Sequence, residues 1–160
     1  MAALERLARR DQSKEELRRA LARAGYDEAV VAAVLVRMTA DRYLDDAGYA
    51  ARVARTRLRI DGLGRHRIRQ DLRARGVPRD LAEGGLAEAL SEVPEADTLE
   101  RVAQRYWRNR VSDEPRQRLR KLWAFLIRRG FPSDLVRARL AELWPRWRDA
   151  LDGLEAAEED

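Results

Sequence analysis

The chain has 160 residues, carries a net charge of +5, and contains one histidine and no cysteine. Without cysteine it cannot form disulfides, thiolate metal sites or a cysteine nucleophile, and His66 alone cannot form a histidine-based metal site. The longest apolar run, residues 29–36, is far shorter than the roughly 20 residues that span a bilayer, and the N-terminus lacks the apolar core of a signal peptide. We therefore expect a cytoplasmic protein with a buried core and with neither a metal nor another cofactor.

One sequence unit recurs three times along the chain. Its reference points are Gly25, Gly76 and Gly130, which are 51 and 54 residues apart. Apolar residues occur eight and four positions before each glycine, and one, five and ten positions after it. Positions four apart lie on one face of a helix, and glycine ends a helix readily because it adopts the left-handed conformation at little cost. Each unit therefore predicts a helix, a glycine corner and a second helix, with a further helix before them.

The first repeat is predicted over residues 1–44. A short helix over residues 4–10 precedes Ser13 and Glu16, which form a capping-box pattern at the start of the next helix. After the glycine corner, a third helix should begin beside Asp27.

The second repeat is predicted over residues 45–95. Asp45 and Asp46 place negative charge where a helix opens near Ala47, and that helix continues over residues 49–60. Three apolar or aromatic residues near the helix ends are expected in the core rather than on a binding surface: Tyr43, Leu44 and Tyr49.

The link after this helix contains Gly62 and Gly64. Closely spaced glycines could bind phosphate, but a nucleotide fingerprint needs a preceding strand and further glycines, and no part of the sequence alternates as a strand does. We predict a helix-to-helix turn here, with His66 as an exposed turn residue. The last helix of this repeat should begin at or beside Pro78.

The third repeat is predicted over residues 96–150, with a first helix over residues 99–110 and a last helix beginning at or beside Pro132. All four tryptophans of the chain lie in it, among arginines. Such residues could stack on nucleic-acid bases, but helical spacing favours packing for Trp107, Trp123 and Trp144, and leaves Trp147 as the one to test for exposure. Residues 151–160 form an acidic tail. The predicted fold class is all-α: three tandem three-helix repeats in an elongated, curved array.

Positive charge is concentrated in the second repeat. Residues 52–79 contain ten arginines and two acids, and residues 80–98 contain six acids and no base. Guanidinium groups bind phosphates and carboxylates with two parallel hydrogen bonds, so the arginines could contact DNA or an acidic protein surface. Alternatively, they could pair with Glu83, Glu88, Glu92 and the other acids that follow. The candidate contact residues are Arg52, Arg55, Arg57, Arg59, Arg65, Arg67, Arg69, Arg73 and Arg75.

The stretch YLDDAGYAARVARTRLRIDGLGRHRIRQDLRARGV, residues 43–77, resembles the signature of the RecX family, the regulators of the recombinase RecA. The matching residues are Asp45, Asp46, Tyr49, Ala50, Arg57, Gly62, Gly64, Ile68, Gln70, Leu72, Gly76 and Val77. Proteins of this family are similarly built from three three-helix repeats, so the resemblance extends to most of the chain. Gly48, Arg65 and Asp71 depart from the family pattern, in which a bulkier residue, proline and glutamate are usual.

The resemblance implies a regulator of homologous recombination, DNA repair and the SOS response. Such a protein lodges in the groove of the RecA filament on single-stranded DNA and inhibits filament growth, ATP turnover and strand exchange. Its expected partners are the RecA filament and single-stranded or double-stranded DNA, with no membrane and no small-molecule substrate, and it is expected to be a monomer. The alternative function is a helical nucleic-acid-binding protein that acts directly on single-stranded or double-stranded DNA.

Catalysis is not expected. A nucleophile needs a base oriented beside it, and metal catalysis needs converging ligands. Serines are few, and the adjacent carboxylates of Asp45 and Asp46 point in two directions on a helix. We therefore predict no catalytic and no metal-binding residues.

Overall fold

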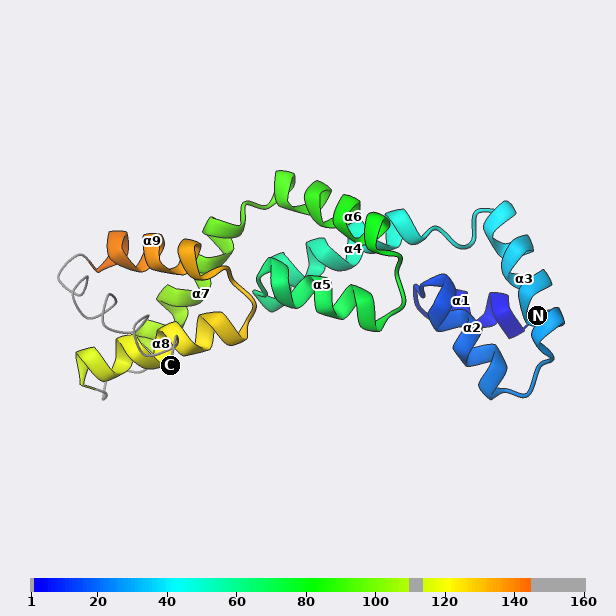
Figure 1. Ribbon diagram of the computed structural model, residues 1–160, viewed down its shortest axis with the longest axis horizontal. Coiled ribbons are helices and arrows are strands. Elements are labelled where there is room, and N and C mark those ends of the chain that lie inside the picture. The colour runs from blue at the N-terminus through cyan, green and yellow to red at the C-terminus, as the bar shows by residue number, and fades with distance from the viewer. Residues whose placement is uncertain (1, 110–113, 145–160) are drawn as a thin grey trace. The chain divides into compact units, whose positions relative to one another are not determined.

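The computed structural model describes residues 2–109 and 114–144, and within these ranges every regular element is helical (Figure 1). The α-helices are α1 (Ala2–Arg9), α2 (Lys14–Arg23), α3 (Glu28–Ala40), α4 (Asp46–Thr56), α5 (Arg65–Ala74), α6 (Arg79–Glu92), α7 (Glu95–Arg108), α8 (Pro115–Arg128) and α9 (Ser133–Leu143). A π-helical segment, Arg57–Asp61, continues α4. The prediction of an all-α protein with three helices per repeat is confirmed. Trp147 and the acidic tail lie outside the described residues.

The described residues fall into two compact units. Of the described residues, the first unit comprises those up to Arg55 together with Arg69–Ala89, and the second comprises Thr56–Ile68 together with those from Leu90 onward. The middle repeat therefore contributes residues to both units. The repeat boundaries and the curved shape expected from the sequence stay predictions.

The three glycine corners have the predicted backbone. Gly25, Gly76 and Gly130 end α2, α5 and α8 with φ angles of 86°, 73° and 86°, in the left-handed region that a helix C-terminus favours and that only glycine enters freely. The predicted capping box at Ser13 and Glu16 is also present, with each side chain bonded to the other's backbone N–H. These local signals therefore placed the start of α2 and the ends of α2, α5 and α8, whereas α7 begins at Glu95, four residues before the predicted start at 99.

The core of the first unit includes a cluster formed by α1, α2 and α3. Leu17, Leu21 and Leu35, three of the positions predicted from the repeat, are buried in it. Val30, the apolar position five residues after the glycine, is exposed, and Val31 is buried in its place. Tyr43 is also exposed, at 57%, whereas Leu44 is buried. Neighbouring side chains point in different directions, and a pattern of apolar residues alone does not say which of two neighbours turns inward.

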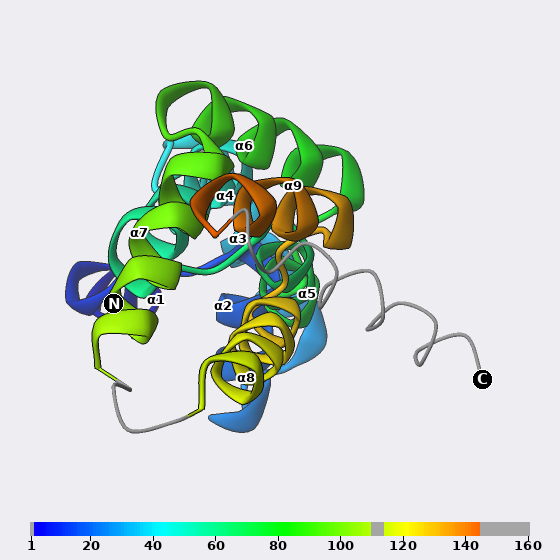
Figure 2. The ribbon, with the colours of Figure 1, turned by 90° about the vertical axis from the view of Figure 1, so that its left-hand side faces the viewer.

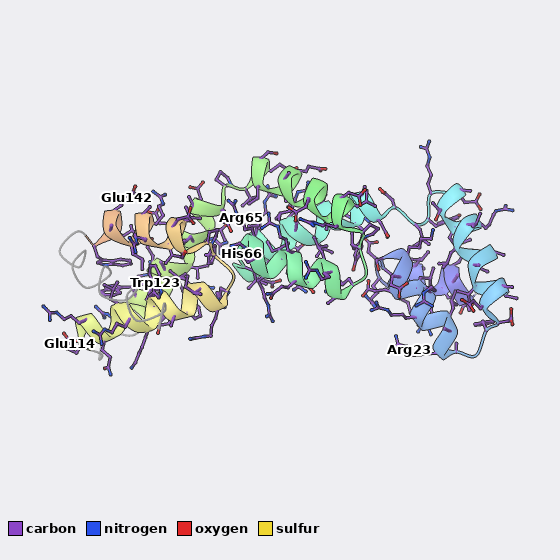
Figure 3. All side chains as sticks on the ribbon, viewed as in Figure 1. Arg23, Arg65, His66, Glu114, Trp123 and Glu142 are labelled. Carbon is purple, nitrogen blue, oxygen red and sulfur yellow. The ribbon has the colours of Figure 1, made fainter. Side chains whose placement is uncertain are left out.

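The core of the second unit is formed by α7, α8 and α9 (Figure 2). Trp123, labelled in Figure 3, is 2% exposed, and the rings of Trp107 and Trp144 stack with their centroids 4.5 Å apart. Packing against the core, as predicted, is confirmed for these three tryptophans. Tyr106 and Phe125 form a second stacked pair at 4.7 Å beside them.

The start of one repeat's second helix meets the end of the next repeat's second helix. In the second unit, the backbone N–H groups of Gly64 and His66 donate to the carbonyls of Arg129 and Gly130 at 2.9 and 3.0 Å. A Cβ atom added at Gly64 would lie 2.3 Å from the Gly130 carbonyl oxygen. The two backbone segments therefore approach each other too closely for any residue other than glycine at position 64. The glycine pair of the link therefore forms a helix-to-helix turn, as predicted, and His66 is exposed.

The same kind of joint occurs in the first unit. The Ser13 hydroxyl donates to the carbonyl of Arg75 at 2.5 Å, and Arg19 donates to that of Ala74 at 3.1 Å. The C-terminal carbonyls of α5, which have no partner within the helix, are thus bound by Ser13 at the start of α2 and by Arg19 within it.

Candidate functional site

Four of the nine candidate arginines pair with the acidic segment that follows them. The pairs are Arg55 with Glu88 at 3.2 Å, Arg59 with Glu92 at 3.8 Å, Arg65 with Glu95 at 2.5 Å and Arg69 with Glu83 at 2.7 Å. Three more pair with other acids: Arg52 with Asp11 at 2.7 Å, Arg57 with Asp61 at 2.6 Å and Arg75 with Asp71 at 3.0 Å. The alternative of pairing within the chain is therefore what the structure shows for most of the set. Contact with a partner stays a prediction.

The pair between Arg65 and Glu95 differs from the others in its burial. The carboxylate of Glu95 is 3% exposed and accepts from both the backbone N–H of Arg65 at 2.6 Å and its Nε at 2.5 Å. Arg65, labelled in Figure 3, begins α5, and its N–H would be missing if a proline stood there, as is frequent in the pattern that the sequence resembles. This departure from the pattern therefore supplies a hydrogen bond to a buried charge.

The pair between Arg69 and Glu83 lies at the surface. Two hydrogen bonds, at 2.7 and 3.0 Å, join the guanidinium to the carboxylate, and these bonds hold the pKa of Glu83 below its usual value. Both side chains remain more than a third exposed, so water and salt weaken this pair.

Arg67 and Arg73 have exposed side chains that form no ion pair with any residue in the described ranges. Both belong to α5. They are the two candidate arginines whose guanidinium groups are available to a partner without breaking an internal salt bridge.

Tyr49 is a buried residue at the centre of a partly buried polar network in the first unit. Its side chain is 3% exposed, its hydroxyl donates to Glu16 at 2.8 Å, and Arg75 donates to that hydroxyl at 2.8 Å. Burial and the bond to Glu16 raise the pKa of Tyr49. Burial would raise the pKa of Glu16 as well, but the hydrogen bonds from Ser13 and Tyr49 outweigh it and lower that pKa. Tyr49 and Arg75 therefore stabilise the fold.

Asp45 and Asp46 bind backbone at two helix starts. Asp46 accepts from the N–H of Lys14 at 2.8 Å, and Asp45 accepts from that of Gly48 at 3.1 Å. A Cβ atom at Gly48 would lie 2.3 Å from the Asp45 carboxylate, so glycine permits this conformation. In the part of the chain that the structure describes, no three histidine, cysteine or acidic side chains form a group that could hold a metal.

The remaining signature residues also have structural positions. Ala50, Ile68 and Leu72 are fully buried, and Gly62 has a φ angle of 63° at the end of the π-helical segment. The signature by which the sequence resembles its family thus consists mainly of core, corner and capping residues. The residues that a partner would touch are not identified by the signature alone.

The second unit contains a cavity of about 900 Å³ that the sequence did not predict as a site. Its lining residues are Ile60, Asp61, Gly62, Arg101, Val102, Arg105, Tyr106, Arg108, Asn109, Phe125 and Arg129. Four of these are arginines and one is acidic. The alternation of arginines and aromatic residues in the third repeat was the only sequence signal for it.

Two of these arginines are held in place by carbonyl groups. Arg101 donates to the carbonyl of Leu58 at 2.9 Å, and Arg129 donates to those of Asp61 and Gly62 at 2.5 and 3.2 Å. These carbonyls belong to the last turn of the π-helical segment and to Gly62 after it, where the carbonyl groups at a helix end lack partners within the helix.

Three sequence patterns of known families match the chain. They are RecX, first three-helix domain, over residues 1–38; RecX, second three-helix domain, over residues 45–86; and RecX, third three-helix domain, over residues 94–140. In the described ranges, no helix is both long and apolar enough to cross a membrane.

Curated relatives and solved structures agree with these matches. The chain is 34% identical over 134 residues to the regulatory protein RecX of Prosthecochloris aestuarii, covering 84% of this chain and 85% of that protein. It is 39% identical over 143 residues to that of Halorhodospira halophila, covering 88% and 84%. The crystal structure of RecX from Lactobacillus salivarius shares the fold, with a TM-score of 0.78 at 20% identity over 89% of this chain and 92% of that one. The chain therefore belongs to the RecX family of regulatory proteins.

Proposed function

We propose that this protein binds the RecA nucleoprotein filament and inhibits filament growth, ATP turnover and strand exchange. The observation that supports the proposal is the match to all three RecX domains in order along the chain. The relatives are named regulatory proteins, and this chain accordingly acts as a regulator with no catalysis of its own. It works in the cytoplasm, as a monomer, in homologous recombination, DNA repair and the SOS response.

The internal salt bridges rank the candidate arginines for contact with the filament. Exposed ion pairs contribute only about 0–1 kcal/mol, so an arginine such as Arg52, which is about half exposed, can exchange its internal acid for one on a partner. Removing the partner of a buried charge costs about 3–5 kcal/mol, so Arg65 stays with Glu95. We therefore place Arg67 and Arg73 first among the contact residues and Arg65 last.

The test is the ATP hydrolysis rate of RecA preassembled on single-stranded DNA, with this protein titrated well below one copy per nucleotide. The wild-type protein lowers the rate at amounts too small to cover the DNA. The double variant Arg67→Glu/Arg73→Glu loses most of this inhibition. Its control is Arg9→Glu/Arg23→Glu, which makes the same charge change at two other exposed arginines, one of them labelled in Figure 3.

Two results would contradict the proposal at different points. If the wild-type protein does not inhibit RecA, the proposed function is refuted. If Arg67→Glu/Arg73→Glu inhibits RecA fully, the proposed function stands, but the contact with the filament lies on another surface. Far-UV circular dichroism of each variant verifies that helix content is unchanged. Size-exclusion chromatography with light scattering measures the mass in solution. The mass of a dimer would contradict the proposal that the protein is a monomer.

Direct binding of DNA is the second candidate function, and the basic cavity of the second unit favours it. Binding through phosphate contacts weakens steeply as salt rises, because each neutralised phosphate releases counterions. If affinity for bare DNA is weak at physiological salt while binding to the filament persists, direct DNA binding is not the main function.

A further inference from the structure

The cavity of the second unit places arginines from two helices around one space. Arg101, Arg105 and Arg108 are four and three residues apart on α7, so they lie along one face of that helix. Arg129 approaches from the C-terminal end of α8. Like charges along one helix face repel each other, so this arrangement stabilises the protein only when an anion lies among them.

Among the described residues that line the cavity, four carry guanidinium groups and one carries a carboxylate. Its one carboxylate, Asp61, is paired with Arg57 at 2.6 Å. Carbonyl groups hold Arg101 and Arg129 but carry no net charge. Arg105 and Arg108 are exposed and form no ion pair within the described residues. Arg52 and Arg59, by comparison, are exposed arginines that do have a carboxylate within 4 Å.

Two of the four guanidinium groups are oriented before any ligand arrives. Arg129 lies 4.8 Å from the ring centroid of Phe125, which itself stacks on Tyr106 at 4.7 Å. Each arginine carries five N–H donors in a rigid plane, so those not bonded to carbonyls remain for an anion. Fixing these side chains in advance lowers the entropy that a ligand must overcome on binding.

We propose that this cavity binds phosphate esters, either the polyphosphate of a free nucleotide or the backbone of a single DNA strand. A phosphate group presents oxygens in several directions and can accept from guanidinium groups on both α7 and α8, and a linked series of phosphates matches several cations in one space. Ile60, which is 74% exposed, and Asn109 provide an apolar and a polar contact for an attached base. The site deepens the second candidate function and does not depend on RecA.

The experiment measures binding of a fluorescein-labelled oligothymidylate of about 15 nucleotides, within the usual site size for such proteins, by fluorescence anisotropy. The full-length chain is compared with Arg105→Ala/Arg108→Ala and with Arg9→Ala/Arg23→Ala, which removes the same charge in the first repeat. The cavity variant raises the Kd at least about tenfold, and the slope of log Kd against log salt falls by about 1 to 2. The control changes the Kd less than about twofold. Arginine-to-alanine changes at exposed helix positions keep the helices intact.

Competition separates the possible ligands. ATP and inorganic triphosphate displace the oligonucleotide if the cavity accepts free polyphosphates, and an unlabelled oligonucleotide alone displaces it if the site needs a strand; either result supports a phosphate-ester site. An oligoglutamate peptide of equal charge that competes as well as triphosphate would show a carboxylate site on an acidic protein and overturn the proposal.

Four other outcomes have defined meanings. An equal loss of affinity in the cavity variant and its control would show general charge attraction and overturn the proposal. Absence of binding to both oligonucleotide and triphosphate at low salt would do the same. Loss of oligonucleotide binding in Arg105→Ala/Arg108→Ala with inhibition of RecA retained would support the cavity and show that the two activities are separate. If the wild-type chain binds phosphate esters but does not inhibit RecA, only the proposed regulatory function fails.

Discussion

Replacing Tyr49 by phenylalanine removes one hydroxyl group from the buried network of the first unit and leaves the ring in place. The hydroxyl has two hydrogen bonds, one donated to Glu16 and one accepted from Arg75, both at 2.8 Å. Hydrogen bonds to charged groups each contribute about 1.5–3 kcal/mol. Both charged partners keep other contacts, since the N–H of Ser13 still donates to Glu16 at 3.1 Å and Asp71 remains paired with Arg75 at 3.0 Å.

The expected loss of stability is therefore closer to the contribution of one such hydrogen bond than to that of two. We expect Tyr49→Phe to lower the free energy of unfolding by about 2 kcal/mol, which corresponds to a decrease in Tm of about 6 °C for a chain of this size. The matched control is Tyr43→Phe. That side chain is 57% exposed, and its hydroxyl has no hydrogen bond to another described residue, so the change stays within about 0.5 kcal/mol.

Urea unfolding followed by far-UV circular dichroism measures both variants, because the signal reports the helices of both units. Tryptophan fluorescence is the wrong probe for this change, since all four tryptophans lie at or beyond Trp107. If Tyr49→Phe and Tyr43→Phe unfold at the same urea concentration, the network around Tyr49 does not stabilise the protein and the reasoning fails.

Two further predictions concern the glycine corners and acid stability. Gly130→Ala should lower the free energy of unfolding by about 2 kcal/mol more than Gly25→Ala does. A Cβ at Gly130 would lie 2.3 Å from the backbone nitrogen of Arg67, whereas one at Gly25 meets nothing within 4 Å. Equal urea midpoints for the two variants would show that close packing at Gly130 does not stabilise the protein. Hydrogen bonds from Arg18 lower the pKa of Glu15 from 4.5 to about 2, so the stability that this carboxylate contributes is complete above pH 4.5 and is lost as the pH falls toward 2. Melting between pH 6 and 2 checks this, since Glu15→Gln should flatten the curve in that interval, and an unchanged slope would contradict it.

The sequence by itself determined the helical fold, the repeat, and the helix ends at the capping box and the glycine corners, although it placed the start of α7 at residue 99 rather than at Glu95. These features depend on residues within one or two helical turns of each other. The capping box of Ser13 and Glu16 spans three residues, and the glycine corner at Gly76 needs only the apolar positions around it. Because such signals act locally, they could be read from spacing alone, and the same spacing carried the resemblance to the RecX family.

Only the tertiary structure decided which charges are neutralised. Arg65 and Glu95 are 30 residues apart, and Arg52 and Asp11 are 41 apart, so neither contact follows from local pattern. A count of arginines and acids shows that pairing is possible, but the packing of the helices selects the partners. It placed carboxylates beside seven of the nine candidate arginines. The basic block of residues 52–79 is therefore largely neutralised within the fold, whereas Arg105 and Arg108 on α7, like Arg67 and Arg73 on α5, form no ion pair with the residues that the structure describes.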